Sequence, residues 1–434
     1  MTITAGSTDT AAGTETVFTY GAPQLKFGVG ASQEVGHDLA TLGARRVLVV
    51  SDPSIEASGT LQQVLDAVAA AGLESVVYAR SRVEPTDESL ADAVDFGRAN
   101  GPYDAVLAVG GGSSIDTAKA VNLLCTNEGE LMDYVNAPVG GGRAPSSALL
   151  PFVAVPTTTG TGSESTTICV LDVLAQHVKT GISHPRLRPT LAVVDPLLTL
   201  TQPAGVTAAA GMDILCHALE SYTARPFTSY PRKQAQDRVP YCGANPVSDL
   251  WAEKALALLS TAFRRSVTHG DDLQARTDMS LAATVAGMGF GNAGVHIPHA
   301  NAYPIAGQVR DFHPADYPGD EAMVPHGMAV SLTAPEAFRF TFEASPERHL
   351  RAADLLEPGG ERPSDPADVL PAVLTRLMRD VGLPSGIGAV GFGESDVPAL
   401  VEGALKQQRL LATAPREVDA DAAAAILTAS VELW

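Results

Sequence analysis

Short apolar runs alternate with helix-length segments through the first half of the chain, and this alternation restricts the possible folds more than any other feature. The runs at residues 46–50, 75–78, 104–109 and 152–155 are rich in Val, Ala and Leu, and segments near 60–72 and 87–99 have the composition of helices. Buried strands separated by helices at this interval indicate βαβ units, which form a parallel sheet and bind ligands at the carboxyl ends of the strands. The sequence therefore predicts an α/β domain with a Rossmann-like sheet.

A glycine-rich loop follows the third of these runs and leads directly into a predicted helix. It contains Gly110, Gly111 and Gly112, followed by Ser113 and Asp116. Glycines allow a phosphate to approach the backbone, and the N-terminus of a helix offers free N–H groups and the positive end of its dipole. The loop lacks the GxGxxG fingerprint of many dinucleotide-binding folds. Its composition and position still predict a site for the phosphates of a nucleotide.

A second loop, residues 156–164, follows the fourth apolar run and combines hydroxyl side chains with glycines. Its candidate cofactor contacts, suited to a ribose and a nicotinamide, are Thr157, Thr158, Thr161 and Gly162. Two such loops on successive strands favour a dinucleotide site and make this half a dinucleotide-binding domain. The alternative is a pair of ordinary strand-to-helix turns.

Asp52 directly follows the first apolar run, at the carboxyl end of its predicted strand. A carboxylate there is placed to hydrogen-bond a ribose hydroxyl and to repel a 2′-phosphate, which favours NAD over NADP. A helix cap or a turn residue is the alternative for a single Asp at a strand end.

The pattern changes after residues 193–196, where the strand signals stop and Ala- and Leu-rich helical segments continue to Trp434. A chain of 434 residues is long enough for two domains. We predict a mobile N-terminal tail at residues 1–16, the NAD-binding α/β domain at 17–196, and an all-α domain at 197–434 that binds metal and substrate.

One helical stretch of the second half, residues 211–220, carries two candidate metal ligands. Asp213 and His217 lie one turn apart on the same helix face. Such a pair alone is more often a surface hydrogen bond or a cap. His299 and His326 further along the chain would complete a set of one carboxylate and three imidazoles, which suits a catalytic iron or zinc site with space for substrate. Iron is our first choice and zinc the second.

The formal net charge of −20 argues against nucleic acid or an anionic membrane as a partner. Residues 1–15 contain no Lys or Arg, and no apolar run is long enough to span a bilayer. The four cysteines show no CxxC spacing and are typical of free thiols in a reducing compartment. These features lead us to expect a cytoplasmic protein that acts on small molecules, and we expect it to form a homodimer.

A small anionic substrate would need a local basic cluster, because the overall field of the protein is negative. The polar segment 225–246 concentrates basic residues close in sequence to the candidate metal helix. We predict Arg238 as the residue that holds a substrate carboxylate, and the weaker candidates are Arg225, Arg232 and Lys233. A solvated surface loop is the alternative.

Five motifs in order, at residues 110–119, 157–164, 211–220, 299–303 and 325–327, resemble the iron-containing (group III) alcohol dehydrogenases. The resemblance extends from about Gly28 to the end of the chain. Within that family the sequence is similar to the hydroxyacid-oxoacid transhydrogenase subgroup. The segments that carry this similarity are 178–182, 215–223, 243–249, 289–296 and 346–350, together with the insertion at 225–249.

The resemblance implies metal ligation by Asp213, His217, His299 and His326. It also implies NAD contacts from Asp52, from residues 110–113 and from 157–162, and the predicted cofactor set further includes Asp116 and Lys179. Many family members have a second histidine four residues after the third ligand, where this chain has Tyr303. We expect Tyr303 to hydrogen-bond substrate or cofactor, and His296 to be a packing histidine.

In the transhydrogenase subgroup the metal polarises an alcohol, bound NAD accepts its hydride, and the hydride returns to a second substrate. By resemblance the donor is 4-hydroxybutyrate and the acceptor is 2-oxoglutarate. The first alternative is an ordinary NAD-dependent, iron- or zinc-containing alcohol or aldehyde dehydrogenase. A remote alternative is a lyase of the dehydroquinate synthase type, which would need a more basic phosphate pocket.

Overall fold

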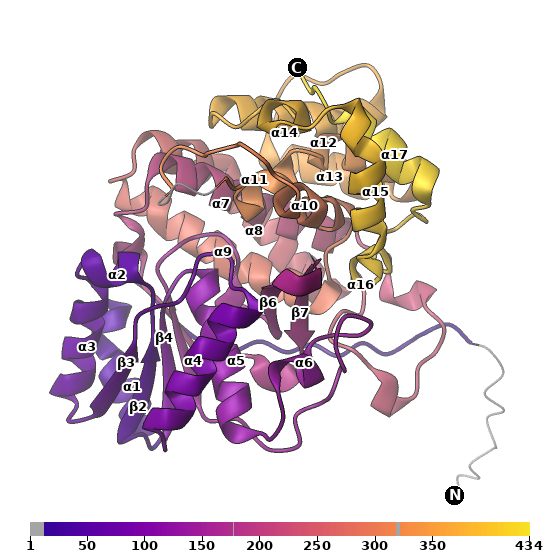
Figure 1. The fold of residues 1–434 in the computed structure, drawn as a ribbon. Coiled ribbons are helices and arrows are strands. Elements are labelled where there is room, and N and C mark those ends of the chain that lie inside the picture. The colour runs from indigo at the N-terminus through magenta and orange to yellow at the C-terminus, as the bar shows by residue number, and fades with distance from the viewer. Residues whose placement is uncertain (1–12, 177, 318–321) are drawn as a thin grey trace, which may run out of the picture.

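A computed structural model of the chain describes residues 13–176, 178–317 and 322–434. It has a half built on a parallel sheet, at the lower left of Figure 1, and a helical half above it. Most of the predicted tail, residues 1–12, lies outside the described residues.

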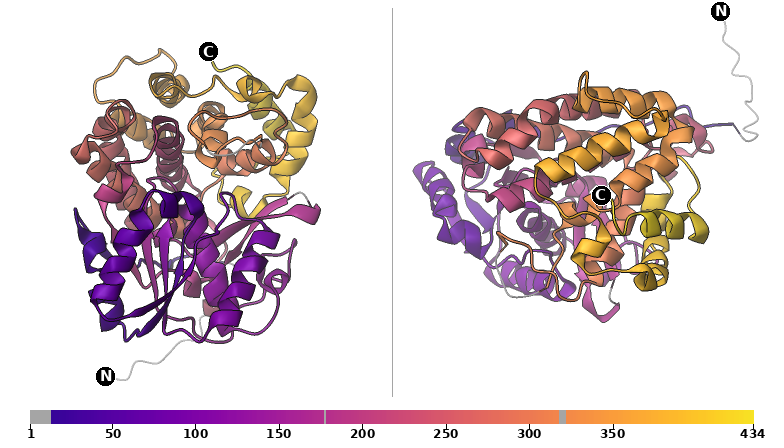
Figure 2. Two further views of the ribbon diagram at one scale, coloured as in Figure 1. Left: turned by 60° about the vertical axis from the view of Figure 1, so that its left-hand side comes forward. Right: turned by 90° about the horizontal axis from the view of Figure 1, so that it is seen from above.

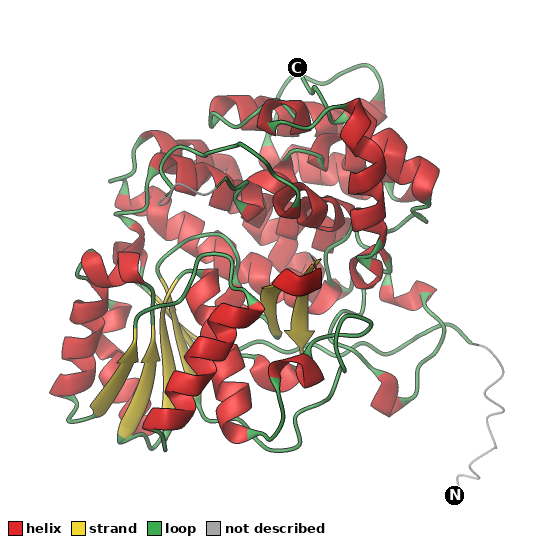
Figure 3. Ribbon diagram, viewed as in Figure 1, coloured by secondary structure: helices red, strands yellow, loops and turns green. Residues whose placement is uncertain are grey.

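One sheet of six parallel strands forms the first half, in the order β1-β8-β5-β4-β2-β3. The strands are shown in yellow in Figure 3. Their bounds are β1 (Gln24–Phe27), β2 (Arg46–Val50), β3 (Glu74–Tyr78), β4 (Ala105–Gly110), β5 (Phe152–Pro156) and β8 (Leu191–Val194). The Rossmann-like sheet predicted from the apolar runs is confirmed. From β2 the chain moves to β3 on one side and then to β4 on the other, so the strand order reverses between β2 and β4.

Helices cover both faces of the sheet because alternate strand residues point to opposite sides. Val47 and Val49 of β2 pack with helices α1 (Val35–Thr41) and α3 (Thr60–Ala70). Leu48 and Val50 pack on the other face with α4 (Asp87–Asn100) and α5 (Gly112–Thr126). The buried strands are apolar on both faces, which is why their runs were visible in the sequence. The short helices α2 (Pro53–Ala57) and α6 (Leu131–Tyr134) complete this half.

An antiparallel hairpin of β6 (Ile168–Val173) and β7 (Val178–Ser183) forms a second, two-stranded sheet. Sequence analysis did not predict it. Cys169, Leu171 and Val173 lie on one face, but the other face carries polar residues such as Asp172 and Lys179, so the apolar signal of the hairpin is weak. Gly181 in β7 weakens the strand signal further. This hairpin lies between the sheet and the helical half and brings Lys179 toward the cleft.

The helical half begins at α7 (Ala204–Thr223), which is buried along most of its length and packs against α8 (Pro246–Thr268) and α9 (Leu273–Ala293). Gly211 permits the contact with α8, because a Cβ there would lie 2.1 Å from a ring atom of Phe263. The views of Figure 2 show α7 enclosed by the other helices. The remaining helices of this half are α10 (Ile297–Gly307), α11 (His326–Ser331), α12 (Ala334–Thr341), α13 (Pro346–Leu356), α14 (Val369–Asp380), α15 (Val397–Leu405), α16 (Gln408–Leu411) and α17 (Ala420–Ala429).

Residues 13–16 correct the predicted mobile tail. Thr14 pairs with Pro231 in an isolated antiparallel bridge, and the backbone N–H of Glu15 donates to the Tyr230 carbonyl at 2.8 Å. The carboxylate of Glu15 is buried against Arg238, at 2.8 Å from its guanidinium. A buried ion pair therefore fixes the part of the tail that the structure describes.

No helix within the described ranges is both long and apolar enough to cross a membrane. All four cysteines are free thiols: Cys169 and Cys216 are buried, and Cys125 and Cys242 are half-buried.

Candidate active site

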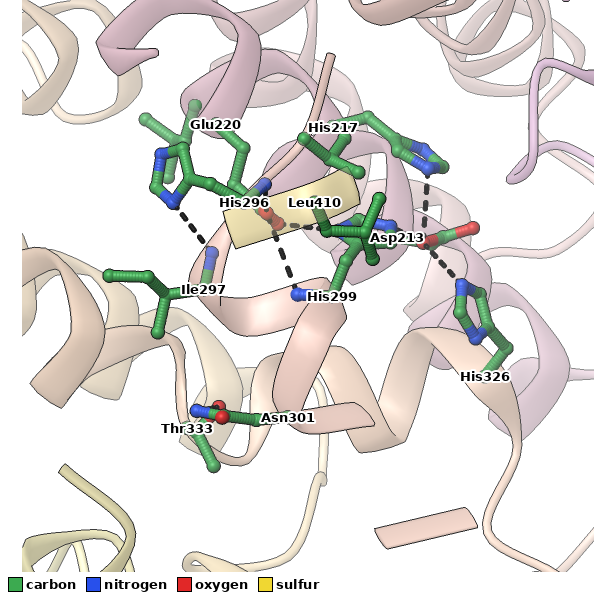
Figure 4. A network of polar contacts seen from close by, with 12 residues as sticks. Asp213, His217, Glu220, His296, Ile297, His299, Asn301, His326, Thr333 and Leu410 are labelled. Carbon is green, nitrogen blue, oxygen red and sulfur yellow. Dashed lines mark hydrogen bonds and ion pairs between the residues drawn. The ribbon is translucent and has the colours of Figure 1, made fainter. Parts of the chain in front are cut away.

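The four predicted metal ligands lie together at the centre of the cleft, although they come from three helices. Asp213 and His217 are on α7, His299 is on α10, and His326 is the first residue of α11. Figure 4 shows the three imidazoles around the Asp213 carboxylate. The Oδ1 atom of Asp213 lies 3.5 Å from Nε2 of His299, 3.7 Å from Nε2 of His217 and 4.0 Å from Nε2 of His326.

The polar atoms of this cluster are incompletely satisfied by the protein. Among the described residues, no hydrogen-bond partner is present for the buried atoms Asp213 Oδ1, His217 Nδ1 and His299 Nε2. A buried polar atom without a partner costs about 1–3 kcal/mol, so such atoms rarely gather without a ligand. One ligand atom each from Asp213, His217 and His299 fall within 4.8 Å of one another. The cluster fits a divalent metal such as iron or zinc.

Glu220, which sequence analysis did not single out, orients His299. Its Oε1 atom lies 2.5 Å from Nδ1 of His299, while Oε2 accepts a 2.5 Å hydrogen bond from the backbone N–H of His296. This contact leaves Nε2 of His299 directed at Asp213, as carboxylates commonly do behind metal-binding histidines. Helical spacing could have identified Glu220 from the sequence, because it lies seven residues after Asp213 on the same face of α7.

His296 is a packing histidine, as predicted. Its Nδ1 accepts a hydrogen bond from the backbone N–H of Ile297 at 2.8 Å, and its Nε2 lies 3.1 Å from the hydroxyl of Thr223. Both ring nitrogens therefore have partners within the protein, whereas His217 and His299 each have one ring nitrogen without a partner among the described residues.

The surroundings shift the pKa values of the candidate metal ligands in different directions. Burial lowers the pKa of His217 to about 3, which leaves its imidazole neutral at pH 7. Burial alone would raise the pKa of Asp213, but the neighbouring imidazoles outweigh it and hold this pKa below the usual value. Burial also lowers the pKa of His299, yet the carboxylates of Glu220 and Asp213 outweigh it and raise the pKa to about 9. Metal binding at neutral pH must therefore displace a proton from His299.

The first glycine-rich loop lies at the point where the strand order reverses. Gly110 ends β4, and α5 begins at Gly112, so the free N–H groups of α5 face the crevice between β2 and β4. A Cβ at Gly110 would lie 2.5 Å from the Ser114 hydroxyl, and one at Gly112 would lie 2.6 Å from Thr161. The close packing of the two loops therefore requires glycine at these positions.

Asp52 follows β2 on the other side of the same crevice. Its Oδ1 accepts hydrogen bonds from the backbone N–H groups of Ser54 and Ile55 and caps α2, and its Oδ2 accepts from the Ser114 hydroxyl at 3.0 Å. The capping role considered as the alternative is thus present in the structure. Contact between Asp52 and a ribose stays a prediction.

The second loop, between β5 and β6, lies against the first. Thr158 contacts Gly111, and Thr161 lies against Gly112 and lines the cleft. Gly162 has φ +58°, and a Cβ there would lie 2.8 Å from the backbone of Gly287 on α9. The buried hydroxyl of Thr157 has no partner among the described residues. The two predicted nucleotide loops therefore form one continuous wall, and their contacts with NAD stay predictions.

Asp116 has partners within the protein in addition to the cofactor contact predicted for it. Its Oδ1 accepts hydrogen bonds from the Ser163 hydroxyl at 2.5 Å and the Lys119 ammonium at 3.1 Å, and its Oδ2 accepts from the backbone N–H of Val170 at 2.9 Å. These bonds brace α5 against the second loop and β6, and Asp116 also lines the cavity, so its contact with cofactor stays a prediction. Spacing along the helix did not reveal these partners.

Lys179 reaches the cleft from β7 with its ammonium already neutralised. It pairs with the carboxylates of Glu84 and Asp172, the latter at 3.2 Å. Its contact with cofactor stays a prediction. Two carboxylates against one ammonium give this corner of the cleft a negative charge.

The structure does not bring Arg238 to the metal cluster. Its guanidinium pairs with Glu15 and donates to the Val17 carbonyl at 2.7 Å, in a separate pocket at the outer edge of the molecule. Arg225, Arg232 and Lys233 are also absent from the cleft lining. The segment 225–246 is basic, as predicted. The carboxylate that pairs with Arg238 is Glu15, 223 residues away in the sequence, and this pairing was not predicted. The arginine in the cleft is Arg409 of α16, which has no helical or motif relation to the metal ligands.

The metal cluster, parts of the two loops and β7 line one cavity of about 110 Å³. Its walls include the four metal candidates, Gly112, Ser113 and Thr161 of the two loops, and Tyr303. The Tyr303 ring centroid lies 6.2 Å from that of His326, and burial raises the pKa of Tyr303 to about 12. The hydroxyl of Tyr303 therefore keeps its proton at neutral pH. A larger cavity of about 970 Å³ adjoins the first and shares Glu84, Lys179 and Tyr303 with it.

Comparison with known proteins places both halves in one family. The family model "Iron-containing alcohol dehydrogenase" matches residues 22–196, and "Fe-containing alcohol dehydrogenase family, C-terminal" matches residues 240–431. A mitochondrial hydroxyacid-oxoacid transhydrogenase of Bos taurus is 42% identical over 97% of this chain and 91% of its own length. The corresponding protein of Homo sapiens is 41% identical over the same shares.

Solved structures show the same fold. The structure of 1,3-propanediol oxidoreductase has a TM-score of 0.82 and 32% identity, and the match covers 96% of this chain and 100% of that one. A sulfoacetaldehyde reductase of Bifidobacterium kashiwanohense in complex with NAD⁺ has a TM-score of 0.77 and 25% identity, with 95% and 98% covered.

Proposed function

The chain belongs to the iron-containing alcohol dehydrogenase family, and from this premise we propose that it is a hydroxyacid-oxoacid transhydrogenase. It is an oxidoreductase of a family that uses NAD(H) and a divalent metal. The relatives at 41–42% identity over almost the whole chain, named as transhydrogenases, support the finer assignment.

One observation supports the proposal most strongly. The metal cluster and the two glycine-bearing loops are walls of a single cavity, in which Gly112, Ser113 and Thr161 face Asp213, His217 and the other candidates. A nucleotide on the loops and an alcohol at the cluster would share that space, so the protein can align the two reacting carbons. The family membership and this arrangement favour hydride transfer over the lyase considered from the sequence.

The proposed reaction has two balanced halves. In the first, 4-hydroxybutyrate gives hydride from C4 to NAD⁺ and loses its hydroxyl proton, which yields succinate semialdehyde, NADH and H⁺. In the second, C2 of 2-oxoglutarate would accept a hydride from the reduced nucleotide and a proton would be taken up, which would yield 2-hydroxyglutarate and NAD⁺. The nucleotide is unchanged over the full cycle.

The residues of the chain position these partners. A bound divalent cation supplies Lewis-acid chemistry at the substrate oxygen, and bound NAD supplies the hydride acceptor. Asp213, His217, His299 and His326 would hold the metal, and Glu220 orients His299. Tyr303 presents a protonated hydroxyl to the cavity and is placed to hydrogen-bond a substrate oxygen.

We assign iron as the metal, with zinc as the second candidate, because the donor set accepts both. The metal content of the protein as purified, followed by reconstitution of metal-free protein with each metal alone, tests this assignment. Activity restored only by zinc would contradict it.

The second candidate function is an ordinary NAD-dependent alcohol dehydrogenase, which the structural match to 1,3-propanediol oxidoreductase favours. Desalted protein separates the two. A transhydrogenase should retain NAD(H) through desalting and should convert both acids without added nucleotide, with ping-pong kinetics. Turnover only with added NAD, release of NADH and a preference for simple alcohols would establish the second function instead.

A cytoplasmic location and a homodimer stay proposals. The first is tested by fractionation of cells that express the tagged chain at native level. The second is tested by light scattering on the purified protein, where a monomer mass would contradict it.

A further inference from the structure

The cavity at the metal cluster contains one basic side chain whose charge the protein does not neutralise. Lys179 and Arg409 are the Lys and Arg residues in its lining. Lys179 is paired with both Glu84 and Asp172. Arg409, by contrast, has no carboxylate within 4.0 Å anywhere in the described parts of the chain. Its guanidinium lies over the ring of Tyr241, with Cζ at 4.8 Å from the ring centroid.

The contact with Tyr241 positions the guanidinium without neutralising it. A cation over an aromatic face is held by the ring quadrupole, and its N–H donors in the guanidinium plane stay free to bind an anion. Tyr241 belongs to the insertion at 225–249, so that segment does reach the cavity, through an aromatic side chain and not through its own arginines.

The wall between Arg409 and the metal cluster is apolar. Leu410, the next residue, packs in one cluster with Phe290, Val295 and Tyr303, and Tyr241 packs against that cluster. Phe290 in turn stacks on the imidazole of His217, with ring centroids 3.8 Å apart. Leu410 lines the same cavity as Asp213 and His299. A substrate that spans from the metal cluster to Arg409 would therefore lay methylene groups along this wall.

The two proposed substrates share a feature that fits this arrangement. In 4-hydroxybutyrate the carboxylate carbon lies three C–C bonds from the reacting C4. In 2-oxoglutarate the distal carboxylate carbon also lies three C–C bonds from the reacting C2. One fixed cation can thus hold the same carboxylate in both half-reactions, while the acids differ only at the reacting carbon.

We propose that Arg409 binds the distal carboxylate of both substrates and sets the chain length that the enzyme accepts. This inference rests on the proposed function, because it takes the two acids as the substrates. Arg409 forms a bidentate contact with the carboxylate, and the net charge of −20 makes this local cation necessary for binding acids.

Arg409→Met and Arg409→Lys test this role. Arg409→Met should lower kcat/KM for 4-hydroxybutyrate and for 2-oxoglutarate by similar factors, each about tenfold to a hundredfold. The ratio of kcat/KM for 4-hydroxybutyrate over 1-butanol, which has a methyl group in place of the carboxylate, should fall by the same factor. Arg409→Lys should restore part of the loss, because it returns the charge without the planar fork.

The matched control is Lys406→Met, which removes a cation that lines the adjoining cavity and is already paired with Glu402 at 2.9 Å. It should leave the ratio unchanged. A chain-length series gives a second readout: the wild-type protein should prefer 4-hydroxybutyrate to 3-hydroxypropanoate and 5-hydroxypentanoate, and Arg409→Met should lose that preference. Metal content and unfolding midpoint of each variant, equal to wild type, show that the fold is kept.

Equal losses for 1-butanol and 4-hydroxybutyrate, or a loss for only one of the two acids, would overturn the inference. The inference would also be overturned if the wild-type protein turns over both acids and Arg409→Met leaves the kcat/KM ratio of 4-hydroxybutyrate over 1-butanol unchanged. The proposed function would then remain intact. Absence of wild-type turnover of either acid would instead overturn the proposed function, and the inference with it.

Discussion

Two clusters of buried charged side chains meet at the same cavity, and they satisfy their polar atoms in opposite ways. The ammonium of Lys119, fully buried, has four partners: Asp116 at 3.1 Å, Ser163 at 2.6 Å, Thr166 at 3.1 Å and the Ile168 carbonyl at 2.6 Å. The cluster around Asp213 leaves three buried atoms without partners in the part of the chain that is described.

This difference separates a structural network from a ligand site. Both clusters begin from an acid and a base one helical turn apart, Asp116 with Lys119 and Asp213 with His217. Sequence spacing is nearly the same in the two cases. Only the completeness of the hydrogen bonds shows that the first holds the loops together and the second is built for a cation.

We call the cluster around Asp213, which leaves buried atoms without partners, the open cluster, and the network around Lys119 the closed cluster. The largest effect should follow from removing a metal candidate of the open cluster. His217→Ala or His299→Ala should abolish metal retention and turnover, because each removes an imidazole whose ring nitrogen faces Asp213. The fold should persist, since the loss is confined to a site for a ligand. Metal analysis and kcat measure the effect. Full activity in a metal-free preparation of either variant would contradict the metal assignment.

Removing Lys119 from the closed cluster should lower the free energy of unfolding instead. Lys119→Met leaves the buried Asp116 carboxylate without its cation, which costs about 3–5 kcal/mol of unfolding free energy. Denaturant unfolding of metal-free protein measures this. In the same assay His326→Ala, at a partly exposed position of the open cluster, should cost less than about 1 kcal/mol. Equal losses in the two variants would remove the distinction between the clusters.

A smaller effect should follow from Glu220→Gln, which changes a residue that contacts His299 but is not itself a metal candidate. The amide keeps the shape but loses the charge that polarises His299, so metal affinity should fall about tenfold to a hundredfold. Turnover at saturating metal should fall much less. Competition with a chelator measures the affinity, and an unchanged value would show that Glu220 only packs.

The smallest effect concerns Asp52, whose carboxylate is bonded within the protein like that of Asp116 but at the edge of the nucleotide crevice. Asp52→Asn keeps an N-cap of similar strength on α2 and removes the charge. The preference for NAD over NADP should narrow by about fivefold, the equivalent of about 1 kcal/mol of repulsion in water. Binding of the two nucleotides measures this, and equal affinity for both in the unmodified protein would show that Asp52 does not face the ribose.

The sequence predicted the parts of the molecule that depend on local patterns. The strands of the main sheet, such as β2 and β4, were visible because strands buried on both faces are continuous apolar runs. The metal candidates were visible because Asp213 and His217 keep helical spacing, and because His299 and His326 lie in motifs that resemble those of the family. Both features need no knowledge of tertiary contacts.

The remaining features depend on contacts between distant segments. Glu220 contacts His299, which is 79 residues away in the sequence. Arg238 pairs with Glu15, 223 residues away, and therefore does not line the cavity. Arg409 reaches the cavity only because α16 packs beside α10. The β6–β7 hairpin was missed because its strands mix apolar with polar residues and Gly181 interrupts its pattern.

The most direct test of the central claim follows a labelled hydride. Desalted protein is given 4-hydroxybutyrate that carries two deuterium atoms at C4, together with 2-oxoglutarate and no added nucleotide. The account predicts equal amounts of succinate semialdehyde and 2-hydroxyglutarate, with one deuterium at C2 of every 2-hydroxyglutarate molecule, and the same labelling when unlabelled NADH is added. No product without added NAD, or label lost to a free pool of NADH, would contradict it.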